Sequence, residues 1–311
     1  MFARAGAAVV LAARGGDALR EVASEIHAAG GNVRVVIADV SRIEEVEKLG
    51  DEAIEAFGRI DTWVNNAGID QWARFVDHTI EEMNQIVATN LLGTMYGARA
   101  ALSRMQDAGT IINIGSVESE RAMPLQSVYA ASKHAVKGFT AALRMELEHD
   151  RSPVDVVLIM PTFIDTPLYE HSGAKLGGVE PRPVPPVYAP AAVAEAIVFA
   201  AQHPGKEIVI GGSGKAFEVL DRFLPNLVEQ AMAVGGAMFK LQRSRRPKIV
   251  PSNVFHSSED YRVSGGYPRL ERSQYTRWIE QRPAIKRALF VAAAAVAVTT
   301  LLRRFGRTPG P

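Results

Sequence analysis

The sequence predicts a doubly wound α/β domain, in which a parallel sheet carries helices on both faces. Short apolar, β-branched runs alternate with helix-length stretches between residues 8 and 210, and buried parallel strands have this composition. The runs cover residues 8–13, 33–37, 60–64, 110–114, 154–159 and 207–210, and two clear helical stretches cover residues 43–57 and 129–148. Ligands of such sheets bind at the carboxyl ends of the strands, so we expect the chemistry directly after each run.

The composition fits one large globular domain with an extension. The chain has 311 residues, of which 47% are hydrophobic and 22% are charged. It contains no cysteine, which excludes disulfides and thiolate metal sites, and its histidines lack the clustered spacing of a metal site. We therefore expect no metal. No secretory leader precedes the first strand-like run, so we expect the catalytic part in the cytoplasm.

The charge is unevenly distributed along the chain. Residues 240–311 hold 15 basic and 4 acidic side chains, whereas residues 1–239 hold 20 basic and 30 acidic ones. A basic tail of this kind suggests contact with an anionic surface or with the protein's own acidic body. The tail has no nucleic-acid-binding motif and few aromatic residues to stack on bases, so we expect no nucleic acid partner.

Polar or turn-forming residues follow most of the predicted strands. They are Arg14, Asp39, the Asn-Asn-Ala-Gly stretch at 65–68, Ser116 and the stretch 161–166. Each also has a plainer interpretation, because Asn, Asp, Gly and Pro are common in the turns of any protein. Their recurrence at one predicted edge of the sheet indicates a binding or catalytic site there.

The helical stretch after Ser116 places a phenol and an ammonium on one face. Tyr129 and Lys133 are four residues apart, which is one helical turn. An exposed helix with a solvated Lys133 is the alternative interpretation. A free phenol has a pKa of about 10, so it needs a nearby cation to act as a base near neutral pH. Lys133 is placed to supply that cation.

Together these residues resemble the short-chain dehydrogenase/reductase family over residues 2–212. The matching pieces are Asp39-Val40, Asn65-Asn66-Ala67-Gly68, Asn90 in ATNLLGT, Ser116 in IINIGSV, Tyr129 and Lys133 in YAASK, and PTFIDTP from Pro161. Their order and the 13-residue spacing from Ser116 to Tyr129 fit the family pattern. The resemblance implies a Rossmann-like fold and an oxidoreductase.

The resemblance also implies a catalytic set. In this family a tyrosine exchanges a proton with the reacting oxygen while a hydride moves between the substrate carbon and a nicotinamide. Tyr129 would be the general acid/base, and Ser116 would hydrogen-bond the reacting oxygen. Lys133 would support the phenolate, and Asn90 would hold a water that relays protons to Lys133. A helix N-cap or an interhelical hydrogen bond is the alternative role for Asn90.

The cofactor contacts are assigned by the same resemblance. The implied residues are Arg14, Asp39, Val40, Asn66, Ala67, Gly68, Tyr129, Lys133, Pro161, Ile164 and Thr166, with Asp39 at the adenine and Thr166 near the nicotinamide. An arginine at the end of the first visible strand accommodates a 2′-phosphate, so Arg14 favours NADP(H). A surface arginine without this role is the alternative.

The sequence departs from the family pattern in two places. Thr162 replaces the glycine of the usual Pro-Gly pair, which stiffens the backbone near the nicotinamide. No Gly-x-x-x-Gly-x-Gly turn precedes residue 8, so the backbone N–H groups that would hold the pyrophosphate have no source. The first strand and most of the first helix are missing as well. Either the start has been assigned too late or the chain is truncated. We expect weak or no NADPH binding by the chain as given, and clear binding once an upstream segment is restored.

The chain is predicted to have three parts. They are a catalytic domain (1–241) whose residues 214–241 are helical, a basic flexible linker (242–274) and a C-terminal apolar helix (275–311). A helix from Pro283 to Arg304 would be about 33 Å long, enough to span a bilayer, with Tyr275 and Trp278 as interface anchors. We expect it to anchor the protein to a membrane. The alternatives are a helix lying in the interface or one packed on the protein.

Residues 167–190 form an irregular stretch that is expected to cover the substrate. Prolines stiffen it, and Gly173, Gly177 and Gly178 are candidate hinges. The residues expected to form an apolar substrate pocket are Met123, Phe163, Leu168, Tyr169 and Leu176. His171 could meet the substrate, but a solvated loop histidine is the favoured interpretation.

Self-association is expected through two helices, residues 90–105 and the one that bears Tyr129. Ala98, Ala100 and Ala101 would allow a second subunit to approach closely. Core packing within one subunit is the alternative.

The predicted function is therefore an NADP(H)-dependent oxidoreductase that interconverts a hydrophobic carbonyl and a secondary alcohol. The alternative is a non-catalytic, membrane-tethered binding or scaffold protein that has lost its cofactor-binding turn.

Overall fold

The computed structural model describes residues 1–233, 237–258, 260–282, 284–286 and 288 of the chain. Its strands are β1 Val9–Ala13, β2 Val33–Ile37, β3 Thr62–Asn65, β4 Gln71–Trp72, β5 Gly109–Ile114, β6 Val154–Pro161, β7 Gly173–Ala174, β8 Val179–Pro181, β9 Glu207–Ile210 and β10 Arg243–Pro247. Its α-helices are α1 Gly16–Ala28, α2 Ile43–Phe57, α3 Ile80–Val87, α4 Gly93–Leu102, α5 Ser127–His149, α6 Leu168–His171, α7 Pro190–Gln202, α8 Gly212–Phe223, α9 Pro225–Ala233 and α10 Ala237–Leu241. Short helical turns are η1 Ala3–Ala5, η2 Phe75–Asp77, η3 Ala88–Leu92, η4 Val117–Ser119 and η6 Thr276–Glu280.

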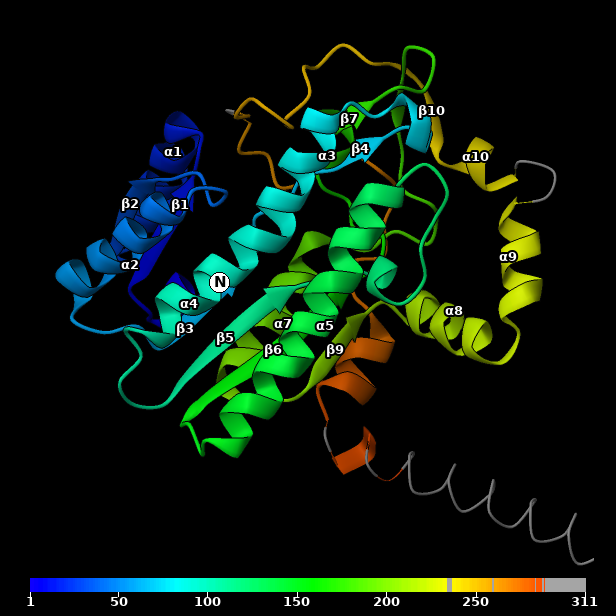
Figure 1. The fold of residues 1–311 in the computed structure, drawn as a ribbon. Helices are drawn as coiled ribbons and strands as arrows, with labels where there is room; N and C mark the ends of the chain where they lie inside the picture. Colours follow the sequence, from blue (N-terminus) through cyan, green and yellow to red (C-terminus); the bar gives the residue numbers. More distant parts are fainter. Residues whose placement is uncertain (234–236, 259, 283, 287, 289–311) are drawn as a thin grey trace, which may run out of the picture.

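The main sheet has four parallel strands in the order β3-β5-β6-β9. The register pairs Asn65 with Asn113, and Pro161 with Ile210, so the carboxyl ends of these strands lie along one edge. Strands β1 and β2 pair with each other in a separate two-stranded parallel sheet. Within the described part of the chain, no strand joins β1 to β3; Figure 1 shows the two sheets beside each other.

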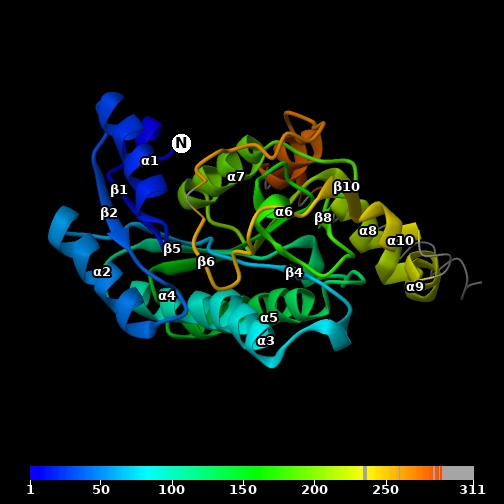
Figure 2. The same cartoon turned by 90° about the horizontal axis from the view of Figure 1, so that it is seen from above.

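Helices cover both faces of the main sheet, as Figures 1 and 2 show. Alternate residues of β5 divide between the two faces, as expected for a strand: Ile112 packs with the α7 alanines Ala192 and Ala196, whereas Ile111 packs with α4 and α5. Proline at the first position of α7 suits a helix start, and its alanines let it lie close to the sheet. The predicted α/β class is confirmed.

The three alanines proposed for subunit contact lie inside the subunit. Ala98, Ala100 and Ala101 are at most 1% exposed, and Ala98 and Ala101 pack with Ile111 of the sheet. The prediction that their surface admits a second subunit is wrong. The reason is that α4 turns its small residues toward the sheet and α2 rather than toward solvent.

The stretch expected as a flexible linker is packed on the domain in its described part. β10 pairs antiparallel with β8, and Asp165 binds Ser264, Tyr267 and Arg269. Tyr275, expected as a membrane-interface anchor, packs on the domain beside Val209. The structure differs from the expectation because the basic residues of this stretch find carboxylate and carbonyl partners on the domain.

The apolar segment 288–302 lies outside the described residues except for its first member. None of the helices in the described ranges has the length and apolar character needed to cross a bilayer.

Candidate active site

Helix α5 positions the phenol and the ammonium. Tyr129 is partly exposed, whereas Lys133 is only 4% exposed. The Lys133 Nζ donates a hydrogen bond to the backbone carbonyl of Ile114 at 2.8 Å and lies 5.7 Å from the centre of the Tyr129 ring. The alternative of a solvated Lys133 is therefore wrong: this lysine is held against the end of β5, beside the phenol.

Burial weakens the hold of Lys133 on its proton. Desolvation lowers its pKa to about 8, and the nearby carboxylate of Asp70 acts in the opposite direction. The ammonium is thus able to release a proton close to neutral pH, which an ordinary surface lysine does not do.

Ser116 stands between β5 and η4, directly across from α5. Its Oγ accepts a hydrogen bond from the Glu118 N–H at 3.1 Å, and its own N–H donates to Ser119 Oγ at 3.2 Å. These bonds fix the serine in extended backbone at the start of the turn. Burial and the carboxylates of Asp70 and Glu118 raise the pKa of Tyr129, and a hydrogen bond with Ser116 acts against them. The resting phenol is therefore protonated.

Asn90 lies in a π-helical turn between α3 and α4 and is fully buried. Its Oδ1 accepts from the Ile69 N–H at 2.9 Å, and its Nδ2 donates to the Ile69 carbonyl at 3.0 Å and to Ser132 Oγ at 3.1 Å. Bulges of this type occur often at functional sites. The side chain of Asn90 thus ties the chain after Gly68 to α5, and its part in a proton relay stays a prediction.

Gly68 belongs to the same cluster. A β-carbon at Gly68 would lie 3.6 Å from both Asn90 Oδ1 and Lys133 Nζ. The glycine therefore keeps the approach to these two groups open. The preceding residues, Asn66 and Ala67, are exposed at the carboxyl edge of the sheet, where a ligand can contact their backbone.

Two buried carboxylates beside Tyr129 were not singled out from the sequence. Asp70 is 1% and Glu118 3% exposed. Gln126 Nε2 donates to Asp70 Oδ2 at 2.6 Å, while Asp70 Oδ1 and Glu118 Oε2 have no hydrogen-bond partner among the described residues. Burial raises the pKa of Asp70 to about 7 and that of Glu118 well above its usual range. Their only sequence signal is position: Asp70 is two residues after Gly68, and Glu118 is two after Ser116.

The sequence matches a family model described as short chain dehydrogenase over residues 1–177. It is 38% identical over 304 residues to an uncharacterized oxidoreductase of Bacillus subtilis (strain 168), YxnA, in a match that covers 96% of this chain and 83% of that protein. The chain belongs to the short-chain dehydrogenase family. The resemblance carried by its motifs is thereby confirmed.

Two solved structures share the fold of this short-chain dehydrogenase. An alcohol dehydrogenase from Thermococcus sibiricus, complexed with 5-hydroxy-NADP, is 26% identical with a TM-score of 0.58, covering 67% of this chain and 87% of that one. A short-chain dehydrogenase/reductase from Burkholderia phymatum, in complex with NAD, is 31% identical with a TM-score of 0.52, covering 52% of this chain and 59% of that one.

The remaining expected cofactor residues follow β2 of the two-stranded sheet and β6 of the main sheet. The Asp39 carboxylate accepts hydrogen bonds from the N–H and Oγ of Ser41 at 2.9 and 2.7 Å, which closes the turn after β2. Val40 packs against Gly93 at the start of α4. Pro161 ends β6, and Thr162 donates to the Ile210 carbonyl at 2.9 Å. Ile164 is buried in the core cluster that α7 covers.

A segment that follows β10 returns to this edge of the short-chain dehydrogenase. We call residues 252–258 and 260–270 the C-terminal strap; it runs between α1 and α6 in Figure 2. Arg14 Nη2 donates to the carbonyls of Asn253 and His256 at 2.6 and 3.1 Å. Val254 is buried against Ile69 and Val128. A β-carbon at Gly265 would lie 2.5 Å from the Thr166 carbonyl.

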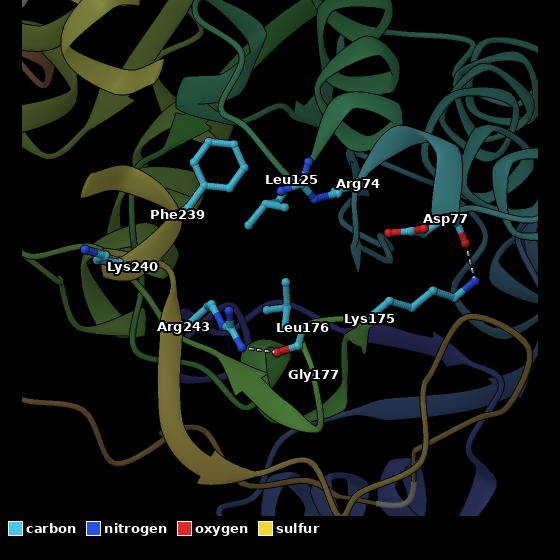
Figure 3. Close-up of a pocket in the computed structure, with 9 residues that line it drawn as sticks. All are labelled: Arg74, Asp77, Leu125, Lys175, Leu176, Gly177, Phe239, Lys240 and Arg243. Atoms are coloured by element: carbon cyan, nitrogen blue, oxygen red, sulfur yellow. Dashed lines mark hydrogen bonds between the residues drawn. The ribbon is translucent and has the colours of Figure 1, made fainter. Parts of the chain in front are cut away.

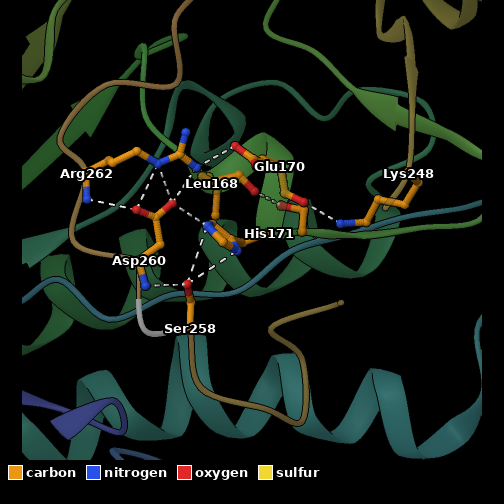
Figure 4. Close-up of polar contacts among 8 residues, drawn as sticks. Leu168, Glu170, His171, Lys248, Ser258, Asp260 and Arg262 are labelled. Atoms are coloured by element: carbon orange, nitrogen blue, oxygen red, sulfur yellow. Dashed lines mark hydrogen bonds and ion pairs between the residues drawn. The ribbon is translucent and has the colours of Figure 1, made fainter. Parts of the chain in front are cut away.

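His171 fastens the strap to α6. Its Nε2 lies 2.8 Å from Asp260 Oδ2, and Arg262 pairs with Glu170 at 2.7 Å (Figure 4). The His171 side chain is 12% exposed, so the expectation of a solvated loop histidine is wrong. Its partner Asp260 lies 89 residues further along the chain, so the local sequence around His171 gave no sign of this contact.

The apolar residues expected to form one substrate pocket divide between two clusters. Tyr169 and Leu176 pack with Trp72 and Leu125, whereas Met123 packs with Val117 and the α9 residues Val228 and Met232. Phe163 touches both clusters. Helix α9 therefore packs against Met123 and Phe163, which local sequence patterns did not indicate.

Proposed function

We propose that this short-chain dehydrogenase is an NADP(H)-dependent oxidoreductase that interconverts an apolar carbonyl compound and its secondary alcohol. The observation that carries the proposal is the pairing of a partly exposed Tyr129 with a buried Lys133 whose Nζ lies 5.7 Å from the ring. A surface helix has no need for such an arrangement, because burying an ammonium costs free energy.

The residues at the carboxyl edge include groups that would contact the adenine and nicotinamide ends of a dinucleotide. The Asn66–Ala67 turn is exposed, and Gly68 places no side chain between it and Lys133, so a ligand there would meet backbone. Asp39 and Val40 follow β2 of the neighbouring two-stranded sheet. When bound, the nicotinamide supplies or accepts the hydride. The chain's own residues orient the reacting oxygen and donate a proton to it or accept one from it.

Tyr129 is the proton donor in the direction of carbonyl reduction. Its raised pKa keeps the phenol protonated at neutral pH, as a general acid requires. Ser116 is the second hydrogen-bonding group for the same oxygen, since it is held at the end of β5 facing α5. Lys133, with a pKa lowered to about 8, is poised to return a proton to the phenolate. The Asp70 carboxylate raises the pKa of both groups, so it favours the ammonium of Lys133 and the neutral phenol of Tyr129.

Arg14 supports the choice of NADP(H) over NAD(H). A guanidinium has five N–H donors, and Asn253 and His256 occupy only Nη2, so donors are left for a 2′-phosphate. The solved relatives were bound to an NADP derivative in one case and NAD in the other, so the support for NADP(H) rests on Arg14.

The test is a titration of the whole chain with NADPH and with NADH, followed by turnover of a series of apolar ketones. The proposal expects tighter binding of NADPH and measurable oxidation of it in the presence of a ketone. Cofactor binding without any turnover would favour the non-catalytic binding protein instead.

A further inference from the structure

A cavity of about 560 Å³ opens beside the N-terminal end of the catalytic helix. Four parts of the chain meet around it: the segment from β4 to η2, the loop before α5, the loop between β7 and β8, and the α10–β10 corner (Figure 3). We call it the cationic pocket, after Arg74, Lys175, Lys240 and Arg243 in its lining.

The pocket has more positive than negative charge. Lys175 is neutralised, because its Nζ donates to Glu82 Oε2 at 2.7 Å and to the Asp77 carbonyl at 2.6 Å. Within the described ranges, Arg74, Lys240 and Arg243 form no ion pair. The lining offers them one carboxylate, that of Asp77. Three unpaired cations against one carboxylate create a positive potential that favours an anion.

The rest of the wall is apolar. Leu125, Leu176 and Phe239 line the pocket and belong to one cluster with Trp72 and Tyr169. Arg243 borders this wall, since its Nη2 donates to the Leu176 carbonyl at 2.6 Å. A matching ligand therefore has an apolar body and an anionic end.

Leu125 connects the pocket with the catalytic residues. It adopts a left-handed backbone with φ of 71°, which costs a leucine free energy. Its carbonyl accepts from the Ala73 N–H at 2.9 Å, which fixes the neighbouring Arg74. Tyr129 follows four residues later, as the third residue of α5.

We propose that the cationic pocket binds the anionic end of the substrate, so that the substrate is an apolar oxo acid or the corresponding hydroxy acid. This inference rests on the proposed function for its catalytic part. The prediction that the pocket binds an anion does not depend on the proposed function, because the pocket is formed by the protein chain alone.

Binding is tested with decanoate as the probe and methyl decanoate as its neutral counterpart, titrated into the full chain at low salt. We expect decanoate to bind at least about tenfold more tightly, and its affinity to fall as salt is raised. Equal affinity for the acid and the ester would overturn the proposal. Decyl phosphate in a parallel titration distinguishes a general anion site from one that prefers a carboxylate.

The variants remove charge without breaking a contact. Arg74→Gln combined with Lys240→Gln is expected to weaken decanoate about tenfold, because neither side chain forms a hydrogen bond in the described structure. The matched control is Arg245→Gln, an exposed cation of β10 outside the pocket lining, which should leave the affinity unchanged. Circular dichroism melting confirms that each variant is folded. Unchanged decanoate binding in the double variant would contradict the pocket assignment.

Kinetics then test the substrate assignment. A fatty acid with a ketone at the ω−1 carbon, which is reduced to a secondary alcohol, should show a lower KM than its methyl ester, and the double variant should remove this difference. Equal KM values for acid and ester in the unaltered protein would overturn the assignment of the pocket to the substrate. Failure to turn over either compound would count against the oxidoreductase proposal, while the decanoate titration would still decide the pocket.

Discussion

The side-chain amide of Asn90 binds both polar groups of the Ile69 backbone, accepting from the N–H at 2.9 Å and donating to the carbonyl at 3.0 Å. All of these atoms are buried. Together with the bond from Asn90 to Ser132, these two hydrogen bonds hold the chain after Gly68 against α5. They thereby set the distance between the Asn66–Gly68 turn and Lys133. Asn90 is in this way a positioning residue for the site.

Replacing Asn90 by alanine should destabilise the protein, because it leaves a buried N–H and a buried carbonyl unpaired. We expect a loss of about 2–4 kcal/mol in the free energy of unfolding, measured by urea denaturation. Asn84→Ala, on an exposed position of α3, is the control and should cost less than about 1 kcal/mol. Equal losses for the two variants would contradict the role of Asn90.

Tyr129→Phe should abolish catalysis while preserving the fold. Removing the hydroxyl deletes the general acid but not the ring, so kcat should fall by about 10²- to 10⁴-fold, with little change in NADPH affinity. Steady-state kinetics and a cofactor titration measure the two quantities. Tyr261→Phe, on a half-exposed strap residue, is the control. A Tyr129→Phe protein with unaltered kcat would show that another group donates the proton.

The sheet and the helix that carries the site could be predicted from the sequence because their signals are local. Strands such as Val33–Ile37 and the helix Ile43–Phe57 appear in the structure with the predicted bounds, although in Val33–Ile37 only Val36 is buried. Tyr129 and Lys133 are one turn apart on any helix, so their proximity needed no tertiary information.

Other features depend on contacts between distant parts of the chain. Arg14 meets Asn253 across 239 residues, and neither residue carries a local sign of the other. Asp70 and Glu118 resemble ordinary turn residues in sequence, and only the folded chain shows that both are buried beside Tyr129. The alanines of α4 suit a subunit interface and a tightly packed core equally well, so composition could not choose between them.

Arg14→Ala should loosen the C-terminal strap. The variant loses the hydrogen bonds to the Asn253 and His256 carbonyls, so amide hydrogen exchange in residues 252–258 should become faster. The NADP(H) proposal adds a second expectation: NADPH should be weakened more than NADH. Arg4→Ala, at an exposed position near the N-terminus, is the control for exchange. Unchanged exchange in the strap would refute its attachment through Arg14, and equal weakening of both cofactors would refute the phosphate contact.

Asp70→Asn tests the buried carboxylate through the pH dependence of stability. Burial raises the Asp70 pKa from its usual 3.8 to about 7, so between these values the native state binds more protons than the unfolded state. The free energy of unfolding therefore falls as the pH rises through this window. Asparagine resembles the protonated acid and does not ionise, so the Asp70→Asn variant should not show this fall. We expect the variant to unfold with a free energy similar to that of the unaltered protein at about pH 4, and about 2–4 kcal/mol higher at about pH 8.

Urea denaturation of both proteins at the two pH values measures this difference, with Asp107→Asn, an exposed carboxylate, as the control that should show no such trend. The same substitution should shift the pH profile of turnover. The Asp70 carboxylate favours the charged form of Lys133 and disfavours that of Tyr129, so its loss should lower the pKa of both groups and move the profile toward lower pH. A pH profile that stays in place while stability changes as expected would limit Asp70 to a structural role.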